Sequence, residues 1–122
     1  MGDWLRPCHA THRLSDGMGD LLWPMGPVEG LENRRGCVYL LSAHDYSVLM
    51  EGDVDWFAES QILKALNRRN LPSEIDVVVV SHHGARDGFN PSFVQLVGAR
   101  HALISVAQSN RYGHPHREAL AR

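Results

Sequence analysis

The pattern of apolar and polar residues along the chain predicts an α/β protein. Five short apolar runs are typical of strands, and they lie at Leu21–Trp23, Cys37–Ser42, Tyr46–Met50, Ile75–Val80 and Ala102–Val106. Turn-forming residues 43–45 join the second and third runs, which predicts a hairpin. The run at Ile75–Val80 is rich in β-branched residues, as in strands that are buried on both faces.

Helix signals separate the later strands. Asp55–Arg69 is amphipathic, and it ends in arginines that suit the negative end of the helix dipole. A second helix is expected at Pro91–Val97, with Asn90 as its N-cap and Gly98 as the residue that ends it. A third is expected over Pro115–Arg122, with proline in its first turn. This order of elements indicates an α/β fold, in which sites usually lie on loops that leave the strand ends.

Composition narrows the class of protein. The 122 residues allow one domain, and 43% hydrophobic with 21% charged residues is a soluble globular profile. A formal net charge of −2 argues against nucleic-acid binding through bulk positive charge. No apolar run approaches the ~20 residues that span a membrane, and the start of the chain has no signal-peptide pattern. Two cysteines, Cys8 and Cys37, allow one disulfide, and eight histidines make metal chemistry worth testing.

Polar residues follow the third and fourth predicted strands. Asp53 comes after the third strand, where a carboxylate suits a metal ion, although Asp53 or Asp55 could instead simply cap the next helix. His82 and His83 end the fourth strand. Because adjacent residues of an extended chain point to opposite sides, we expect one histidine to face a site and the other to orient it. The alternative is a purely structural histidine pair.

The segment Asn110–Pro115 follows the last predicted strand and combines an amide, an arginine and a histidine. Such a set can bind phosphate or protonate a leaving group, and the alternative is an ordinary turn with capping residues. The remaining histidines have no patterned partners and are interpreted as surface or packing residues: His9, His12, His44, His101 and His116. The glycine motifs of serine hydrolases, P-loop proteins and dinucleotide-binding proteins are absent.

Together these segments resemble the carboxyl-terminal metallo-β-lactamase-like domain of the ComEC family of bacterial DNA-uptake channels. The resemblance is carried by LLWP at Leu21–Pro24, VLMEGD at Val48–Asp53, SHHGARDGFNPSF at Ser81–Phe93 and ALISVAQSNRYGHPHREALAR at Ala102–Arg122. The string NRYGHP is the most specific part. The chain has Glu51 where that family usually has threonine and Ser81 where it often has proline. It lacks the His-x-His-x-Asp motif of the amino-terminal half of such domains.

The resemblance implies that residues 1–122 are the second half of a metallo-β-lactamase-like αββα sandwich, with a mixed sheet and flanking helices. It implies a divalent metal cofactor, zinc or manganese, with two ions in the complete domain. Asp53 and His83 would be metal ligands and catalytic residues, and His82 is the alternative ligand. The remaining ligands would come from an upstream half of the domain.

The resemblance also assigns the substrate site. Asn110 and His114 would contact phosphate or the leaving group, with His114 counted among the catalytic residues and Arg111 among the substrate-binding ones. The reaction implied is metal-assisted phosphodiester hydrolysis. The substrate would be the single strand of DNA that is not transported during uptake.

The implied partners are single-stranded DNA, the upstream half-domain and a membrane channel, with the domain on the extracytoplasmic side of a bacterial membrane. Alone, the fragment is expected to be inactive and to leave core surface exposed. Two alternatives stay open. One is a non-catalytic half-domain with a binding or structural role, and the other is a soluble hydrolase of the same superfamily that acts on a small phosphodiester or lactone.

Overall fold

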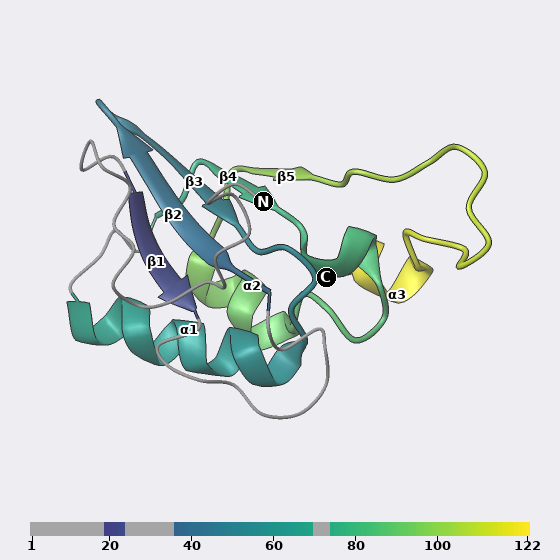
Figure 1. Ribbon diagram of the computed structural model, residues 1–122, viewed down its shortest axis with the longest axis horizontal. Coiled ribbons are helices and arrows are strands. Elements are labelled where there is room, and N and C mark those ends of the chain that lie inside the picture. The colour runs from purple at the N-terminus through teal and green to yellow at the C-terminus, as the bar shows by residue number, and fades with distance from the viewer. Residues whose placement is uncertain (1–18, 24–35, 70–73) are drawn as a thin grey trace, which may run out of the picture.

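The computed structural model describes residues 19–23, 36–69 and 74–122. Its five strands form one mixed sheet (Figure 1). Its strands, in spatial order, are β1 (Gly19–Trp23), β2 (Val38–Ala43), β3 (Tyr46–Met50), β4 (Val77–Val79) and β5 (His101–Leu103). The first three strands pair antiparallel, whereas β3, β4 and β5 are parallel to one another. The α/β class and the β2–β3 hairpin expected from the sequence are confirmed.

Two helices cover one face of the sheet, namely α1 (Trp56–Arg69) and α2 (Pro91–Val97) (Figure 1). Alternate residues of the strands, such as Leu40, Leu49 and Val78, are buried against helix residues such as Ile62 and Phe93 in one core cluster. Burying each such side chain contributes about 1.5–3 kcal/mol. No described helix combines the length and the apolar character needed to cross a membrane.

Capping explains where the two helices begin. Asp55 Oδ1 accepts a hydrogen bond of 3.1 Å from the Ala58 N–H, so Asp55 is the residue that caps α1. Asn90 Oδ1 accepts one of 2.9 Å from the Ser92 N–H, and the left-handed Gly98 ends α2, both as predicted. The cap of α1 therefore leaves the carboxylate of Asp53 available for another role.

Two predicted boundaries at the end of the chain are wrong. The last strand stops at Leu103 and not at Val106, because its partner β4 ends where the chain turns at Ser81–Gly84. The last helix, α3, covers only Arg117–Leu120. His116 precedes it as an extended residue whose N–H donates to the Gly84 carbonyl over 2.9 Å, so the chain at Pro115 is not yet helical.

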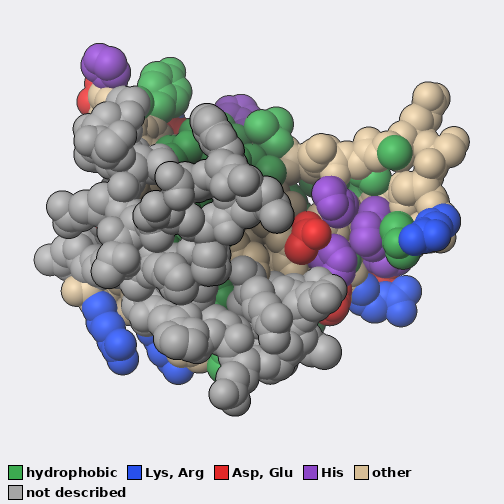
Figure 2. Space-filling model, viewed as in Figure 1, with side chains coloured by type: hydrophobic (Ala, Val, Ile, Leu, Met, Phe, Trp, Pro, Cys, Tyr) green, Lys and Arg blue, Asp and Glu red, His purple; other side chains and the backbone are tan. Residues whose placement is uncertain are grey.

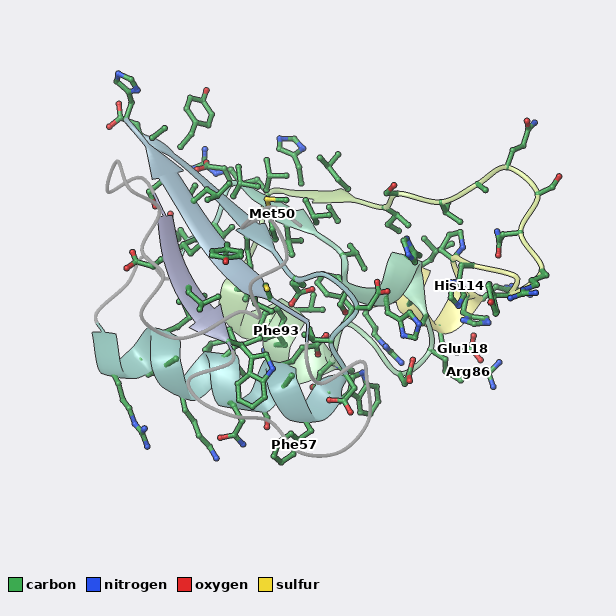
Figure 3. All side chains as sticks on the ribbon, viewed as in Figure 1. Met50, Phe57, Arg86, Phe93, His114 and Glu118 are labelled. Carbon is green, nitrogen blue, oxygen red and sulfur yellow. The ribbon has the colours of Figure 1, made fainter. Side chains whose placement is uncertain are left out.

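Apolar side chains remain exposed on the sheet face opposite α1 and α2. Met50 is 43% exposed and Leu103 is 57% exposed. Both residues are in register with Val79 of the intervening strand, so their side chains lie on the same face. The described part of this face therefore offers an apolar strip for further packing (Figure 3 labels Met50).

Some sequence-based interpretations fall partly outside the described residues. Cys37 is disulfide-bonded, whereas Cys8, the other cysteine of the sequence, lies outside the described part. His9 and His12 also lie outside it. His44 occupies the tight turn of the β2–β3 hairpin and is exposed, as expected of a surface residue.

Candidate functional site

The three parallel strands end at the same edge of the sheet, and polar residues follow each of them. Asp53 follows β3, His82 and His83 follow β4, and His114 lies on the long loop after β5. This convergence forms a cavity of about 730 Å³, lined by Asp53, His82, His83, Ala85, Arg86, Asp87, Tyr112, His114 and His116. Figure 2 shows histidine side chains gathered beside acidic and arginine side chains at this end of the molecule. Asp53, His82, His83 and His114 are therefore brought together, whereas Asn110 and Arg111 do not line this cavity.

Both histidines of the pair line the cavity, which corrects the expectation that only one would face it. The chain stops being extended at Val80 and enters the tight turn Ser81–Gly84. Within that turn, His82 and His83 adopt φ values of 48° and 55°. Two consecutive left-handed residues other than glycine cost roughly 1–3 kcal/mol each, and such strain is characteristic of functional sites.

His83 and Asp53 form an acid–imidazole contact between two predicted ligands. The Nε2 atom of His83 lies 3.6 Å from Asp53 Oδ1, and both side chains are about half exposed. The other ring nitrogen, Nδ1, lies 2.7 Å from the carbonyl oxygen of Ser105. A carbonyl can only accept, so Nδ1 carries the hydrogen. A neutral His83 would therefore present the lone pair of Nε2 toward a carboxylate oxygen, an arrangement that favours a proton or a cation between them.

Three near-parallel rings lead outward from this contact. The His83 and His114 rings are 6.4 Å apart with an interplanar angle of 22°, and the His114 and Tyr112 rings are 5.7 Å apart at 27°. The guanidinium carbon of Arg111 lies 4.8 Å from the centre of the Tyr112 ring. We call these four side chains the ring ladder. Arg111, which was predicted to bind substrate, thus lies at the outer end of the loop and not on the wall of the cavity.

His114 is the central ring of the histidine cluster. His82 and His116 contact it edge-on, at centroid distances of 5.6 and 4.8 Å. Desolvation lowers the pKa of His114, and the nearby His116, His82 and His83 lower it further. The cluster therefore favours the neutral form of His114 near pH 7.

Asn110 shapes the loop that carries His114. Its Oδ1 accepts a 2.8 Å hydrogen bond from the His114 N–H, and its Nδ2 donates to the carbonyls of His114 and Ala107 over 2.8 and 3.2 Å. Asn110 also lines a neighbouring hollow of about 300 Å³. A phosphate contact by Asn110 would require it to give up one of these loop bonds.

Five residues of the cavity wall were not among the predicted site residues: Ala85, Arg86, Asp87, Tyr112 and His116. Arg86 pairs with Glu118 over 3.2 Å, and Figure 3 shows the two side chains close together on the side of the molecule that carries His114. Asp87 lies 3.5 Å from Nδ1 of His82. Their closeness in sequence to His82, His83 and His114 is the one signal that could have revealed them.

A buried acidic layer supports the histidine turn from inside. Glu51 and Glu59 are both 0% exposed. The Ser81 N–H donates to Glu51 Oε2 over 3.1 Å, and the Ser81 hydroxyl donates to Glu59 Oε1 over 2.9 Å. Glu59 also accepts from the backbone N–H groups of Phe89 and Asn90. These bonds tie the start of the turn to β3 and α1 and fix the loop that follows it.

The two buried carboxyl groups differ in their hydrogen bonding. Burial raises the pKa of Glu51 well above its usual value, and the negative charge of Glu59 raises it further. Burial also raises the pKa of Glu59, but hydrogen bonds from Asn90, Ser81 and Phe89 act in the opposite direction. Among the described residues, Glu51 Oε1 is a buried oxygen without a hydrogen-bond partner. Burial therefore favours the neutral form of Glu51, whereas Glu59 has hydrogen-bond donors that favour its charged form.

Few of the described side chains are grouped as metal ligands would be. Within residues 19–23, 36–69 and 74–122, no three side chains of His, Cys, Asp or Glu are grouped so that they could hold a metal ion. The contact between Asp53 and His83 supplies two donor atoms of suitable chemistry. The described residues thus supply a pair of donors of suitable chemistry but no group of three.

Comparisons with known proteins point to bacterial competence. The chain is similar to ComE operon protein 3 of Bacillus subtilis (strain 168), with 27% identity over 108 residues. It is similar to Competence protein ComA of Neisseria gonorrhoeae, with 30% identity over 84 residues. It is also similar to Recombination protein 2 of Haemophilus influenzae (strain ATCC 51907 / DSM 11121 / KW20 / Rd), with 28% identity over 102 residues.

These matches cover 88%, 69% and 84% of this chain but only 13%, 12% and 12% of the three proteins. The chain thus spans about an eighth of the length of the curated relatives it matches. No family model and no solved structure matches it. The comparisons support a competence-related family and leave the chemistry of the site to be argued from its residues.

Proposed function

We propose that this chain is the second half of a metal-dependent phosphodiester hydrolase domain, and that single-stranded DNA is its substrate in a DNA-uptake system. The observation that carries the proposal is the contact between Asp53 and His83 at the carboxyl edge of three parallel strands. A histidine oriented by a carbonyl through one nitrogen, with the other directed at a carboxylate, is the arrangement of metal-ligating imidazoles. The names of the relatives supply the biological context.

Asp53 and His83 would hold one divalent ion between carboxylate oxygen and imidazole nitrogen, and zinc and manganese both accept these donors. His82 is the alternative nitrogen ligand from the same turn. When bound, the ion would lower the pKa of a water ligand and stabilise charge on the phosphate. The missing ligands, and the second ion, would come from an upstream half of the domain.

The residues of this chain then have distinct tasks. His114 favours its neutral form, so it would steady the phosphate or the leaving oxygen by donating a hydrogen bond from its ring N–H. Arg86 and Arg111 place positive charge at the cavity wall and at the outer end of the loop, which suits phosphate. Asn110 keeps His114 in position through three hydrogen bonds.

The apolar strip that includes Met50 and Leu103 supports the same proposal. A sheet with helices on one face and exposed apolar residues on the other is suited to a second packed layer. We assign the upstream half-domain to that position, and a membrane channel would be the further partner. A purely structural role of the half-domain would use the same strip but would need neither Asp53 nor His83.

The test is cleavage of an end-labelled single-stranded oligonucleotide by the native protein that carries this chain, with manganese or zinc added. Asp53→Ala and His83→Ala should each lower cleavage by more than the about 10–100-fold that loss of an outer-shell partner costs. His44→Ala is the matched control, because His44 is also exposed and has a φ of 54° but lies in the β2–β3 turn. Full activity in either site variant would refute the ligand assignment.

A further inference from the structure

Tyr112 differs from the other residues of the site because its ring does not pack into the described part of the protein core. The side chain is 60% exposed, although it lines the main cavity. It belongs to the loop after β5, which projects away from the sheet in Figure 1. Gly113, with a φ of 70°, turns the chain directly after it, and the Gly113 N–H donates to the Asn110 carbonyl over 3.3 Å. The loop thus holds an aromatic ring at the rim of the cavity, where it contacts solvent.

The ring ladder gives this aromatic ring a defined orientation. Tyr112 is nearly parallel to His114, with an interplanar angle of 27°. The Arg111 guanidinium lies over the Tyr112 ring at 4.8 Å and is itself exposed. The same guanidinium donates a hydrogen bond to the Tyr112 hydroxyl over 2.5 Å, so a planar cation already lies against this ring.

We infer that Tyr112 and Arg111 form a platform for one nucleobase of a single strand, next to the phosphate bound in the cavity. The base would stack on the ladder at Tyr112, and Arg111 would move from the ring to the neighbouring phosphate. This inference rests on the proposed function, and it adds a base contact to a site otherwise argued only from phosphate chemistry. A base inside a duplex has both faces covered, so the platform selects single strands.

The charge of the chain is consistent with this mode of binding. With a net charge of −2, the chain carries no overall excess of positive charge to support nonspecific binding to the phosphate backbone. Stacking on an aromatic ring adds affinity that does not depend on salt in that way. We therefore expect binding of single strands to depend only weakly on salt, with a slope of about −0.7 for each phosphate that an arginine contacts.

The experiment is an anisotropy titration of a labelled single-stranded oligonucleotide with the full chain, in a chelator so that no hydrolysis occurs. Tyr112→Ala should weaken binding by roughly 5- to 100-fold, the range expected for loss of one stacked base. Tyr112→Phe, which keeps the ring, should bind like the wild type. The matched control is Tyr46→Ala, because Tyr46 is 72% exposed but lies next to the β2–β3 turn.

A second probe isolates the base from the backbone. The wild type should bind an abasic strand more weakly than it binds the normal strand, and Tyr112→Ala should cause no further loss of affinity for the abasic strand. The inference is overturned if Tyr112→Ala binds the normal strand as tightly as the wild type does, or if it loses equal affinity for the abasic strand. It is also overturned if the wild type shows no saturable binding, or prefers a duplex of the same sequence.

These outcomes are separate from those of the proposed function, because binding is measured without metal. A protein that binds strands through Tyr112 but never cleaves them contradicts the hydrolase proposal alone. A protein that cleaves them in a metal-dependent way, while Tyr112→Ala binds normally, contradicts the platform alone.

Discussion

The buried acidic layer and the open cavity lie on opposite sides of the same turn, and they are built differently. Inside, Glu59 accepts hydrogen bonds from Ser81, Phe89 and Asn90. Outside, the acid–imidazole contacts are 3.5 and 3.6 Å long and involve partly exposed side chains. The turn is thus fixed from its buried side, while the groups on its exposed side keep hydrogen-bonding capacity for a ligand.

The same contrast explains how strained residues persist at the site. His82 and His83 adopt left-handed backbone conformations that cost energy. The residue before them, Ser81, is fully buried and bonded through both its N–H and its hydroxyl to the acidic layer. The acidic layer therefore supplies the interactions that compensate the strain of the turn.

Removing Glu59, the acid with more hydrogen bonds, should have the largest effect on stability. Glu59→Ala would leave the Ser81 hydroxyl and the Asn90 N–H without this acceptor, whereas the Phe89 N–H keeps its bond to Ser81 Oγ, and each unsatisfied group costs about 1–3 kcal/mol. We expect the free energy of unfolding in urea to fall by about 3 kcal/mol or more. The control is Glu74→Ala, since Glu74 is exposed and its side chain is expected to contribute within about 0.5 kcal/mol. A loss for Glu59→Ala as small as that of the control would show that the layer does not support the turn.

Removing the charge of Glu51, the other buried acid, tests its effect on the pH dependence of stability. Because the folded protein raises the pKa of Glu51 above 4.5, Glu51 stabilises the fold at low pH, and this contribution is lost as pH rises through the folded pKa. Glu51→Gln removes that dependence. From pH 5 to pH 8, urea unfolding should show a steeper decline for the wild type than for the variant, with a difference of about 1 kcal/mol per pH unit or less. Parallel curves would mean that Glu51 is charged in the folded protein.

The convergence of the site residues could be predicted from the sequence because it follows from topology. Asp53, His83 and His114 each follow a run of strand-forming residues, and parallel strands share their carboxyl edge. The helix boundaries at Asn90 and Gly98 were predictable for a similar reason, since capping is a local preference.

The features that could not be predicted depend on tertiary contacts. Glu51 lies beside a strand and Glu59 lies on a helix, and nothing local distinguishes these acids from solvent-facing ones. Their burial results from packing against Ser81 and the loop at Phe89. The left-handed turn that directs both histidines into the cavity depends on the same contacts, so a rule for extended chains gave the wrong orientation.

The boundaries predicted for β5 and α3 were wrong for the same reason, because they too depend on tertiary contacts. The apolar run up to Val106 has strand propensity, but a strand needs a partner, and β4 ends before one is available. Proline favours the first turn of a helix, yet at Pro115 the following His116 N–H is bound to the Gly84 carbonyl instead. This contact brings the loop that carries His114 back to the histidine turn.

Titration of the chain itself with manganese and zinc, beside the His83→Ala and His44→Ala variants, tests the Asp53–His83 pair most directly. We expect weak binding of about one ion per chain, lost in His83→Ala and kept in His44→Ala, because Asp53 and His83 supply only two protein ligands. Binding that survives in His83→Ala, or that is equally reduced in His44→Ala, would contradict the claim that this pair is half of a metal site.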